Sequence, residues 1–206
     1  MGFIRHYILP KEVDFNAVLQ AQVNVTHRVV DPLYKVCIEN DAAALADLDA
    51  DARQAGRLKT EHMEELLDVF ITPYDKESIY RFISQLDWVV LSVKHFKLET
   101  HAYSISNLQC YRDIMHLLVQ MSAQLAAGVG QLASGQLKAI TRKTDSVHDQ
   151  YDQVVTLCAE QAAALLQQDD CKRIIVYKDI LNQLREIAKR IHVTANTLED
   201  MAIKVV

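Results

Sequence analysis

The stretch from Phe70 to Leu86 decides the fold, and it reads FITPYDKESIYRFISQL. It predicts the end of one helix and the start of the next. Leu66, Val69 and Phe70 close an apolar stripe on the preceding segment, and their three and four residue spacing is typical of the buried face of a helix. We therefore expect a corner between two helices here, with Phe70 as the last core residue before it.

The residues after this stripe have the chemistry of a helix N-terminus. Threonine caps helices well and proline fits the first helical position, so we expect Thr72 as the cap, Pro73 next and Asp75 in the first turn. The apolar residues that follow are Ile79, Phe82, Ile83, Leu86, Val90 and Val93. Their spacing predicts a long helix with one buried face.

The composition favours few, long helices. Half of the 206 residues are hydrophobic, which is enough for a sizeable core, and only 5 glycines and 3 prolines are available for turns. Every periodic segment follows the helical period and none alternates as a strand does. The sequence therefore predicts an all-α protein.

The segment from Phe70 to Ile79 resembles the signature F-I-T-P-[FY]-D-[RK]-[ED]-[DS]-I of the PhoU-like phosphate transport regulator family, the accessory proteins of Pit-type phosphate transporters. The residues of this signature corner are Phe70, Ile71, Thr72, Pro73, Tyr74 and Asp75. The resemblance implies an all-helical fold of two similar three-helix halves. It also implies that acidic pairs four residues apart bind metal, as in many family members.

Six helical segments follow from the apolar spacing: about 15–36, 40–70, 72–101, 105–130, 137–168 and 170 to near the C-terminus. Because Pro32 removes a helical hydrogen bond, we expect a kink or an early end of the first helix near Asp31. A pair of aspartates at 169 and 170 is expected to cap the last helix. Helices of this length predict an elongated molecule.

A weak internal repeat divides the chain into two halves. Residues 82–86 align with residues 180–184, and the same offset aligns the pair Asp47 and Asp51 with Asp145 and Asp149. Together with the resemblance, this alignment predicts a first three-helix half at residues 1–104 and a second at 105–206. We expect the two pseudo-repeated bundles to pack as one PhoU-like domain.

The net charge and the cysteines limit the cellular environment and the kinds of partner that we expect for this protein. A net charge of −5 gives no general basic field for nucleic acid, so we expect no nucleic-acid partner. The four cysteines form no C-x-x-C pair, and no stretch is apolar enough for a transmembrane segment. We expect a soluble, cytoplasmic protein, and homo-oligomers remain open.

Acidic pairs on two helices are the candidate metal ligands. Asp47 with Asp51, and Asp145 with Asp149, are spaced so that each pair lies on one helix face, and Asp152 adds a further carboxylate to the second set. Such pairs can hold iron or another divalent ion if a facing helix supplies more oxygen ligands. The alternative is the solvated acidic face of an amphipathic helix, which is commoner.

The residues that we expect to face these acidic pairs indicate that the metal site of the family has been lost. The resemblance implies further acidic pairs at positions that are here Asp87 with Leu91, and Arg185 with Lys189. Two basic side chains oppose a divalent ion in a partly buried site. We therefore hypothesise that Arg185 and Lys189 replace the metal by pairing with the three carboxylates at 145, 149 and 152, and we expect no cofactor, although a divalent ion or iron stays open.

A second strip runs along the helix that follows the corner, away from its buried seam. It includes Tyr80, Trp88, which is the sole tryptophan, and Leu91, which stands where the family carries an acid. Because apolar strips are usually covered, we expect these three residues to lie at a contact between halves, chains or partners.

No set of nucleophile, base and oxyanion donors stands out in the sequence, so we expect no enzyme. The resemblance implies an accessory or regulatory protein of phosphate transport, whose partner is a membrane phosphate transporter or its regulator. The alternative is a metal-binding helical bundle that senses or stores iron or another divalent ion.

Overall fold

The computed structural model describes residues 13–39, 42–105 and 108–204. Its helices are α2 (Phe15–Val30), α3 (Leu33–Ile38), α4 (Ala42–Asp68), α5 (Lys76–Ala102), α6 (Arg112–Val129), α7 (Leu137–Leu165) and α8 (Cys171–Ile203), with short 3₁₀ turns at Gln109–Tyr111 and Leu132–Ser134. All regular elements in these ranges are helices, so the all-α prediction is confirmed. The first predicted helix is divided in the structure into α2 and α3.

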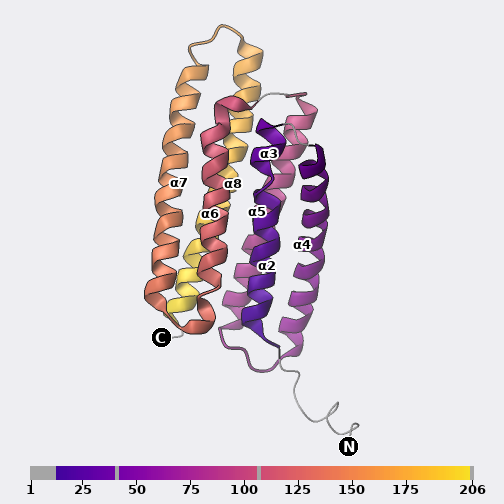
Figure 1. Cartoon of the computed structure of the whole chain (residues 1–206), viewed down its shortest axis with the longest axis vertical. Helices are drawn as coiled ribbons and strands as arrows, with labels where there is room; N and C mark the ends of the chain where they lie inside the picture. Colours follow the sequence, from indigo (N-terminus) through magenta and orange to yellow (C-terminus); the bar gives the residue numbers. More distant parts are fainter. Residues whose placement is uncertain (1–12, 40–41, 106–107, 205–206) are drawn as a thin grey trace, which may run out of the picture.

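The long helices run along one axis and form an elongated bundle, as predicted (Figure 1). In Figure 1, α7, α6, α2 and α4 lie side by side in one layer, and α5 and α8 lie behind them. Helix α5 packs against α8, and α2 packs against α6, so both layers join elements of the two predicted halves. The division of the chain at residues 104 and 105 stays a prediction.

The break between α2 and α3 has the expected cause. Helix α2 begins after Asp14, whose carboxylate accepts hydrogen bonds from the backbone N–H groups of Asn16 and Ala17 at 3.0 and 3.2 Å. It ends at Val30, and the chain resumes as α3 only after Pro32. The prediction of an early end near the proline is confirmed.

The apolar seam of α5 occupies the centre of the core. Its six predicted core residues are all buried, and they are Ile79, Phe82, Ile83, Leu86, Val90 and Val93. They belong to one hydrophobic cluster that also contains buried residues of α2, α4, α6, α7 and α8. The core is therefore shared by both predicted halves, and α5 supplies a full face to it.

The start of α8 and the end of α6 fix how the helices of the second half lie. Helix α8 starts after Asp170, whose carboxylate accepts from the backbone N–H of Arg173 at 3.1 Å, which confirms the predicted acidic cap. Near the end of α6, a Cβ on Gly128 would stand 2.9 Å from Cδ2 of Leu198. The glycine thus lets α8 come close to α6.

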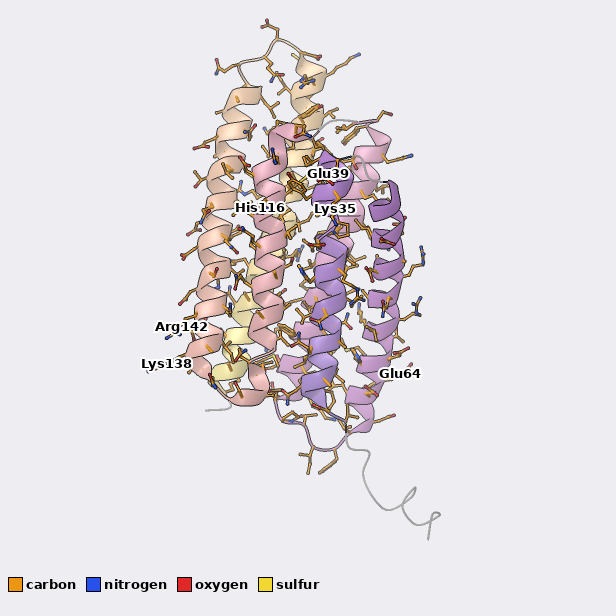
Figure 2. All side chains as sticks on the ribbon, viewed as in Figure 1. Lys35, Glu39, Glu64, His116, Lys138 and Arg142 are labelled. Carbon is orange, nitrogen blue, oxygen red and sulfur yellow. The ribbon has the colours of Figure 1, made fainter. Side chains whose placement is uncertain are left out.

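Charged side chains occupy the outward faces of the outer helices. Figure 2 shows Glu64 on α4, and Lys138 and Arg142 on α7, pointing away from the bundle. These faces are typical of solvated amphipathic helices. The outer face of α5 differs from them, as described below.

Candidate functional site

The corner between α4 and α5, at residues 69–75, is held in place by buried and polar contacts. Tyr74 is 7% exposed, and its hydroxyl donates a hydrogen bond of 2.6 Å to Oδ1 of Asn16 on α2. Burial, and then the nearby charge of Asp14, raise the pKa of Tyr74, so the hydroxyl stays a donor. The hydroxyl of Thr72 donates to the backbone carbonyl of Tyr74 at 2.6 Å. The corner is thus tied to α2 and to itself.

The predicted cap of α5 was wrong by three residues. Helix α5 begins at Lys76, and its cap is Asp75, whose carboxylate accepts from the backbone N–H and the hydroxyl of Ser78 at 3.2 and 3.1 Å. Thr72 cannot serve, because the helix begins only after Tyr74 has reached α2. Desolvation raises the pKa of Asp75, but the hydrogen bonds from Ser78 and from the backbone of the first turn outweigh it, so the pKa is lowered.

Large apolar side chains protrude from this corner. Phe70 is 88% exposed and Ile71 is 82% exposed, and Leu67, at the end of α4, is as exposed as Ile71. The expectation that Phe70 closes the buried stripe was therefore wrong, although Val69 is buried as predicted. Helix α4 ends at residue 68, so helical spacing no longer decides which side chain of the corner faces the core. The amine of Lys76 donates to the carbonyl of Val69 and fixes the backbone beside them.

The outer face of α5 carries the second exposed apolar group. Tyr80, Trp88 and Leu91 are 58%, 46% and 37% exposed. Leu91 lines a hollow together with residues of α8, and the predicted contact of these side chains with another chain or partner stays a prediction. Trp88 does meet the second half, because the guanidinium of Arg190 on α8 lies 5.1 Å from the centre of its ring.

Most of the large apolar side chains that are exposed in the described part of the chain lie in this region. Among the described residues, eleven large hydrophobic side chains are exposed, and eight of them lie between Leu67 and Tyr103. The other three are Leu166, Ile175 and Ile203. The corner and the outer face of α5 together are therefore the candidate interaction site of this molecule.

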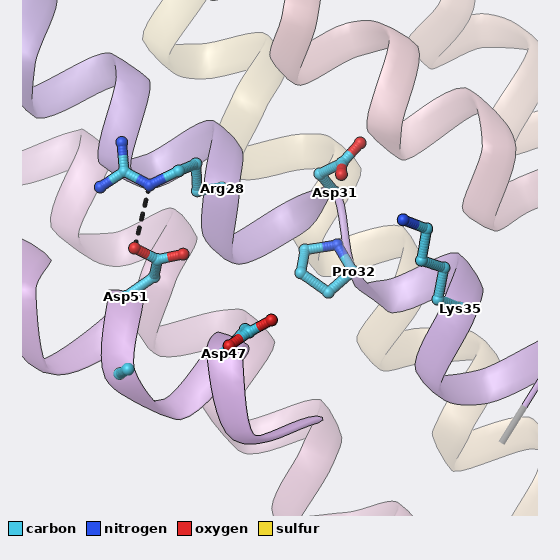
Figure 3. A pocket seen from close by; sticks show the side chains of 7 residues that line it. Arg28, Asp31, Pro32, Lys35, Asp47 and Asp51 are labelled. Carbon is cyan, nitrogen blue, oxygen red and sulfur yellow. Dashed lines mark hydrogen bonds and ion pairs between the residues drawn. The ribbon is translucent and has the colours of Figure 1, made fainter. Parts of the chain in front are cut away.

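The acidic pair of the first half is partly neutralised by a guanidinium. Nε of Arg28 on α2 lies 2.9 Å from Oδ1 of Asp51, and Asp47 is exposed one turn before it (Figure 3). Arg28, Asp47 and Asp51 line a hollow of about 300 Å³, together with Asp31, Pro32, Lys35 and Ala50. A cation would have to compete with Arg28 for the carboxylate of Asp51.

The acid on α5 also has a basic partner. Lys59 of α4 pairs with Asp87, the single acidic residue of the four positions that the resemblance assigns to the facing helices. The side chain of Asp87 is 14% exposed. Basic side chains thus pair with acidic ones in the first half, whereas we had expected basic side chains to pair with carboxylates in place of a metal in the second half.

The predicted charge pairing in the second half is not formed. Asp145, Asp149 and Asp152 are exposed on α7, and Arg185 and Lys189 are exposed on α8. Within the described ranges, no ion pair joins either basic residue to any of the three carboxylates, and no group of three or more His, Cys, Asp or Glu side chains is arranged to hold a metal. The physical reason is that all five side chains are exposed, so water solvates their charges and burial does not force them to pair.

A histidine pair that sequence reasoning did not single out lies in that seam. The rings of His148 on α7 and His192 on α8 are 4.7 Å apart, and Tyr151 lies 4.5 Å from His192. Nε2 of His148 and Nδ1 of His192 are buried without a hydrogen-bond partner. Burial, and then the proximity of His148, lower the pKa of His192, although the charge of Asp152 acts against them.

The fold has solved counterparts. No protein-family model matches the chain. A PhoU-like protein of Shewanella oneidensis MR-1, solved by crystallography, superposes with a TM-score of 0.81 at 11% identity, covering 93% of this chain and 100% of that one. The chain has the PhoU-like fold. The resemblance read from the Phe70–Ile79 segment is thereby confirmed at the level of the fold.

A second solved structure and a sequence relative are also similar to this chain. The second Shewanella oneidensis MR-1 structure, described as a putative PhoU-like phosphate regulatory protein, has a TM-score of 0.77 at 14% identity, with 93% of this chain and 100% of that one covered. The UPF0111 protein YkaA of Bacillus subtilis (strain 168) is 26% identical over 144 residues, which is 69% of this chain and 70% of that protein. Among the described residues, no helix is long and apolar enough to cross a membrane.

Proposed function

We propose that this PhoU-like protein is a non-enzymatic regulator of phosphate transport that acts in the cytoplasm and docks, through its signature corner, on a membrane phosphate transporter or its regulator. The observation that carries the proposal is the exposure of Phe70 and Ile71 on a fixed backbone. Two adjacent side chains of this size gain free energy when a partner removes them from water. The PhoU-like neighbour that is described as a phosphate regulatory protein supports the choice of phosphate transport.

The way the corner is held supports docking over a passive loop. Tyr74 anchors it to α2, and Lys76 binds the backbone carbonyl of Val69. A loop that is already ordered loses little conformational entropy on binding, so more of the apolar gain appears as affinity. The contacts of Tyr74 and Lys76 thus hold Phe70 and Ile71 at the surface.

The alternative of a metal-binding bundle has less support. Its first acidic pair shares Asp51 with Arg28, and its second set, at residues 145, 149 and 152, is exposed on one helix. A hard divalent cation takes six or more oxygen ligands, and one helix face supplies too few of them. Elemental analysis of the purified protein tests this alternative directly, since one bound metal per chain would favour it over docking.

The docking proposal is tested by phosphate uptake in the host cell. The gene is deleted and replaced by a copy encoding Phe70→Ser with Ile71→Ser, and uptake of labelled phosphate is compared with the wild-type copy. We expect the double variant to behave as the deletion while its circular dichroism and thermal melt match the wild type, because both side chains contribute little to the core. Wild-type uptake from the double variant would refute docking through the corner.

A matched control uses an equally bulky apolar residue elsewhere. Leu166 is 66% exposed and follows α7, away from the corner. Leu166→Ser removes an exposed aliphatic side chain of the same size as that of Ile71 without touching the signature. We expect this variant to keep wild-type uptake, and a loss equal to that of the double variant would mean that general surface hydrophobicity, and not the corner, matters.

A further inference from the structure

The outer face of α5 carries a helix-packing seam that stays partly exposed, although Arg190 of α8 lies over the ring of Trp88. Tyr80, Ser84, Trp88, Leu91 and His95 follow one another at intervals of four, four, three and four residues. This is the spacing by which two helices interdigitate their side chains. The seam can complement itself about Trp88, since aromatic rings stand at both ends and the small Ser84, one turn before Trp88, is matched by the large Leu91, one turn after it.

Two hollows of almost equal size flank Trp88 along this seam. The first, of about 510 Å³, lies over Ser84 and is also lined by Tyr80 and Lys59. The second, of about 520 Å³, lies beyond Trp88 and is lined by Leu91, His95 and residues of α8. Each hollow therefore has large side chains at its edge, with Trp88 shared between them.

We infer that this face binds a second copy of the chain, with the two α5 helices antiparallel and Trp88 on the two-fold axis. In that arrangement Leu91 of each copy enters the hollow over Ser84 of the other, and Tyr80 lies opposite His95. A two-fold interface requires one surface patch to complement itself, and a seam with the small Ser84 and the large Leu91 one turn to either side of Trp88 meets this condition.

The charges at the two ends of the seam fit the same pairing. The rim of the first hollow carries Glu77 and Arg81, which pair at 3.1 Å, and the rim of the second carries Glu186 and Arg190, which pair at 2.6 Å. An antiparallel copy brings one rim over the other. Because each rim carries a carboxylate and a guanidinium, neither rim opposes only charges of its own sign.

The centre of the seam is already ordered for this contact. Arg190 lies over the ring of Trp88 and holds it beside the two hollows.

The test is the mass in solution of two variants, alone and mixed. The wild-type protein should sediment at twice the 23.4 kDa mass of the chain. Ser84→Arg fills the hollow and Leu91→Asp removes the side chain that enters it, so each variant alone should sediment as a monomer. Mixed with different tags, they should form heterodimers, because the introduced guanidinium of one chain then meets the introduced carboxylate of the other. The second contact of that heterodimer, between Leu91 and Ser84, is unchanged.

Any of the following results would overturn the inference. A wild-type monomer at all accessible concentrations, or one that binds only an amphipathic helical peptide, would show that the seam takes another occupant. Wild-type dimers that survive both substitutions would place the interface elsewhere, and failure of the mixture to pair would exclude the antiparallel register. Leu166→Asp, at an exposed apolar position outside the seam, is the control and should leave the dimer mass unchanged.

Discussion

Removal of one hydroxyl group tests how the signature corner is held. Tyr74→Phe deletes the hydrogen bond of 2.6 Å to Asn16 and leaves the ring, which is 7% exposed, in its place. Asn16 is only partly buried, so water can reach its freed oxygen. We therefore expect a loss near the usual net value of a neutral hydrogen bond, about 1 kcal/mol, and not the larger penalty of a stranded buried acceptor.

The assay is urea denaturation followed by circular dichroism, with the free energy of unfolding extrapolated to water. The matched control is Tyr80→Phe, because that hydroxyl belongs to a side chain that is 58% exposed, and we expect a change within about 0.5 kcal/mol. A double-mutant cycle with Asn16→Ala isolates the contact from any change in helix propensity. The coupling energy should account for most of the Tyr74→Phe loss.

Two results would refute this account of the corner. If Tyr74→Phe and Tyr80→Phe cost the same, the hydroxyl of Tyr74 has no structural role. If the effects of Tyr74→Phe and Asn16→Ala are additive, the two residues are not coupled in solution, and the corner is not anchored to α2. In either case Phe70 and Ile71 would sit on a loose loop, and the proposed docking would lose its physical basis.

Three further predictions concern titration and charge. Burial raises the pKa of Tyr111, so the unfolded chain loses this proton first above about pH 10, and the free energy of unfolding should fall there, less steeply in Tyr111→Phe. Burial lowers the pKa of His192, so the unfolded chain gains this proton first below about pH 6.5, and acid should destabilise the wild type more than His192→Gln in urea melts at several pH values. Arg185→Ala and Lys189→Ala should each change stability by no more than about 0.5 kcal/mol, because both side chains are exposed, and a much larger loss in thermal melts would restore the charge pairing that the structure lacks.

The periodic part of the sequence predicted the structure well. The buried face of α5 and the end of α2 before Pro32 both follow from local rules, namely the spacing of apolar residues and the missing N–H of proline. The Asp170 cap of α8 follows in the same way. These features depend only on neighbours within a few residues, and such neighbours can be read from the chain.

The corner was predicted less well because a distant contact decides it. Thr72 and Asp75 are both good caps by local rules, and Pro73 favoured the first of them. The structure uses Asp75, because Tyr74 must first reach Asn16, which is 58 residues away in sequence. The exposure of Phe70 has the same origin, since its direction depends on where α4 stops and not on the period of α4.

The charged residues show how a difference between the halves arises from packing. In the first half, Asp87 on α5 is 14% exposed, so a cation must lie beside it, and Lys59 of α4 does so. In the second half, Arg185 and Lys189 occupy the corresponding positions of α8 but are exposed to water, which solvates them, and neither forms an ion pair with a carboxylate of the described residues. The sequence shows which charges are present at these positions, but only the burial of each side chain decides whether its charge needs a partner of opposite sign. Burial differs in the same way along the outer face of α5, where Lys59 of α4 lines one hollow beside Trp88 and residues of α8 line the other, so that Trp88 and Leu91 are each covered only in part.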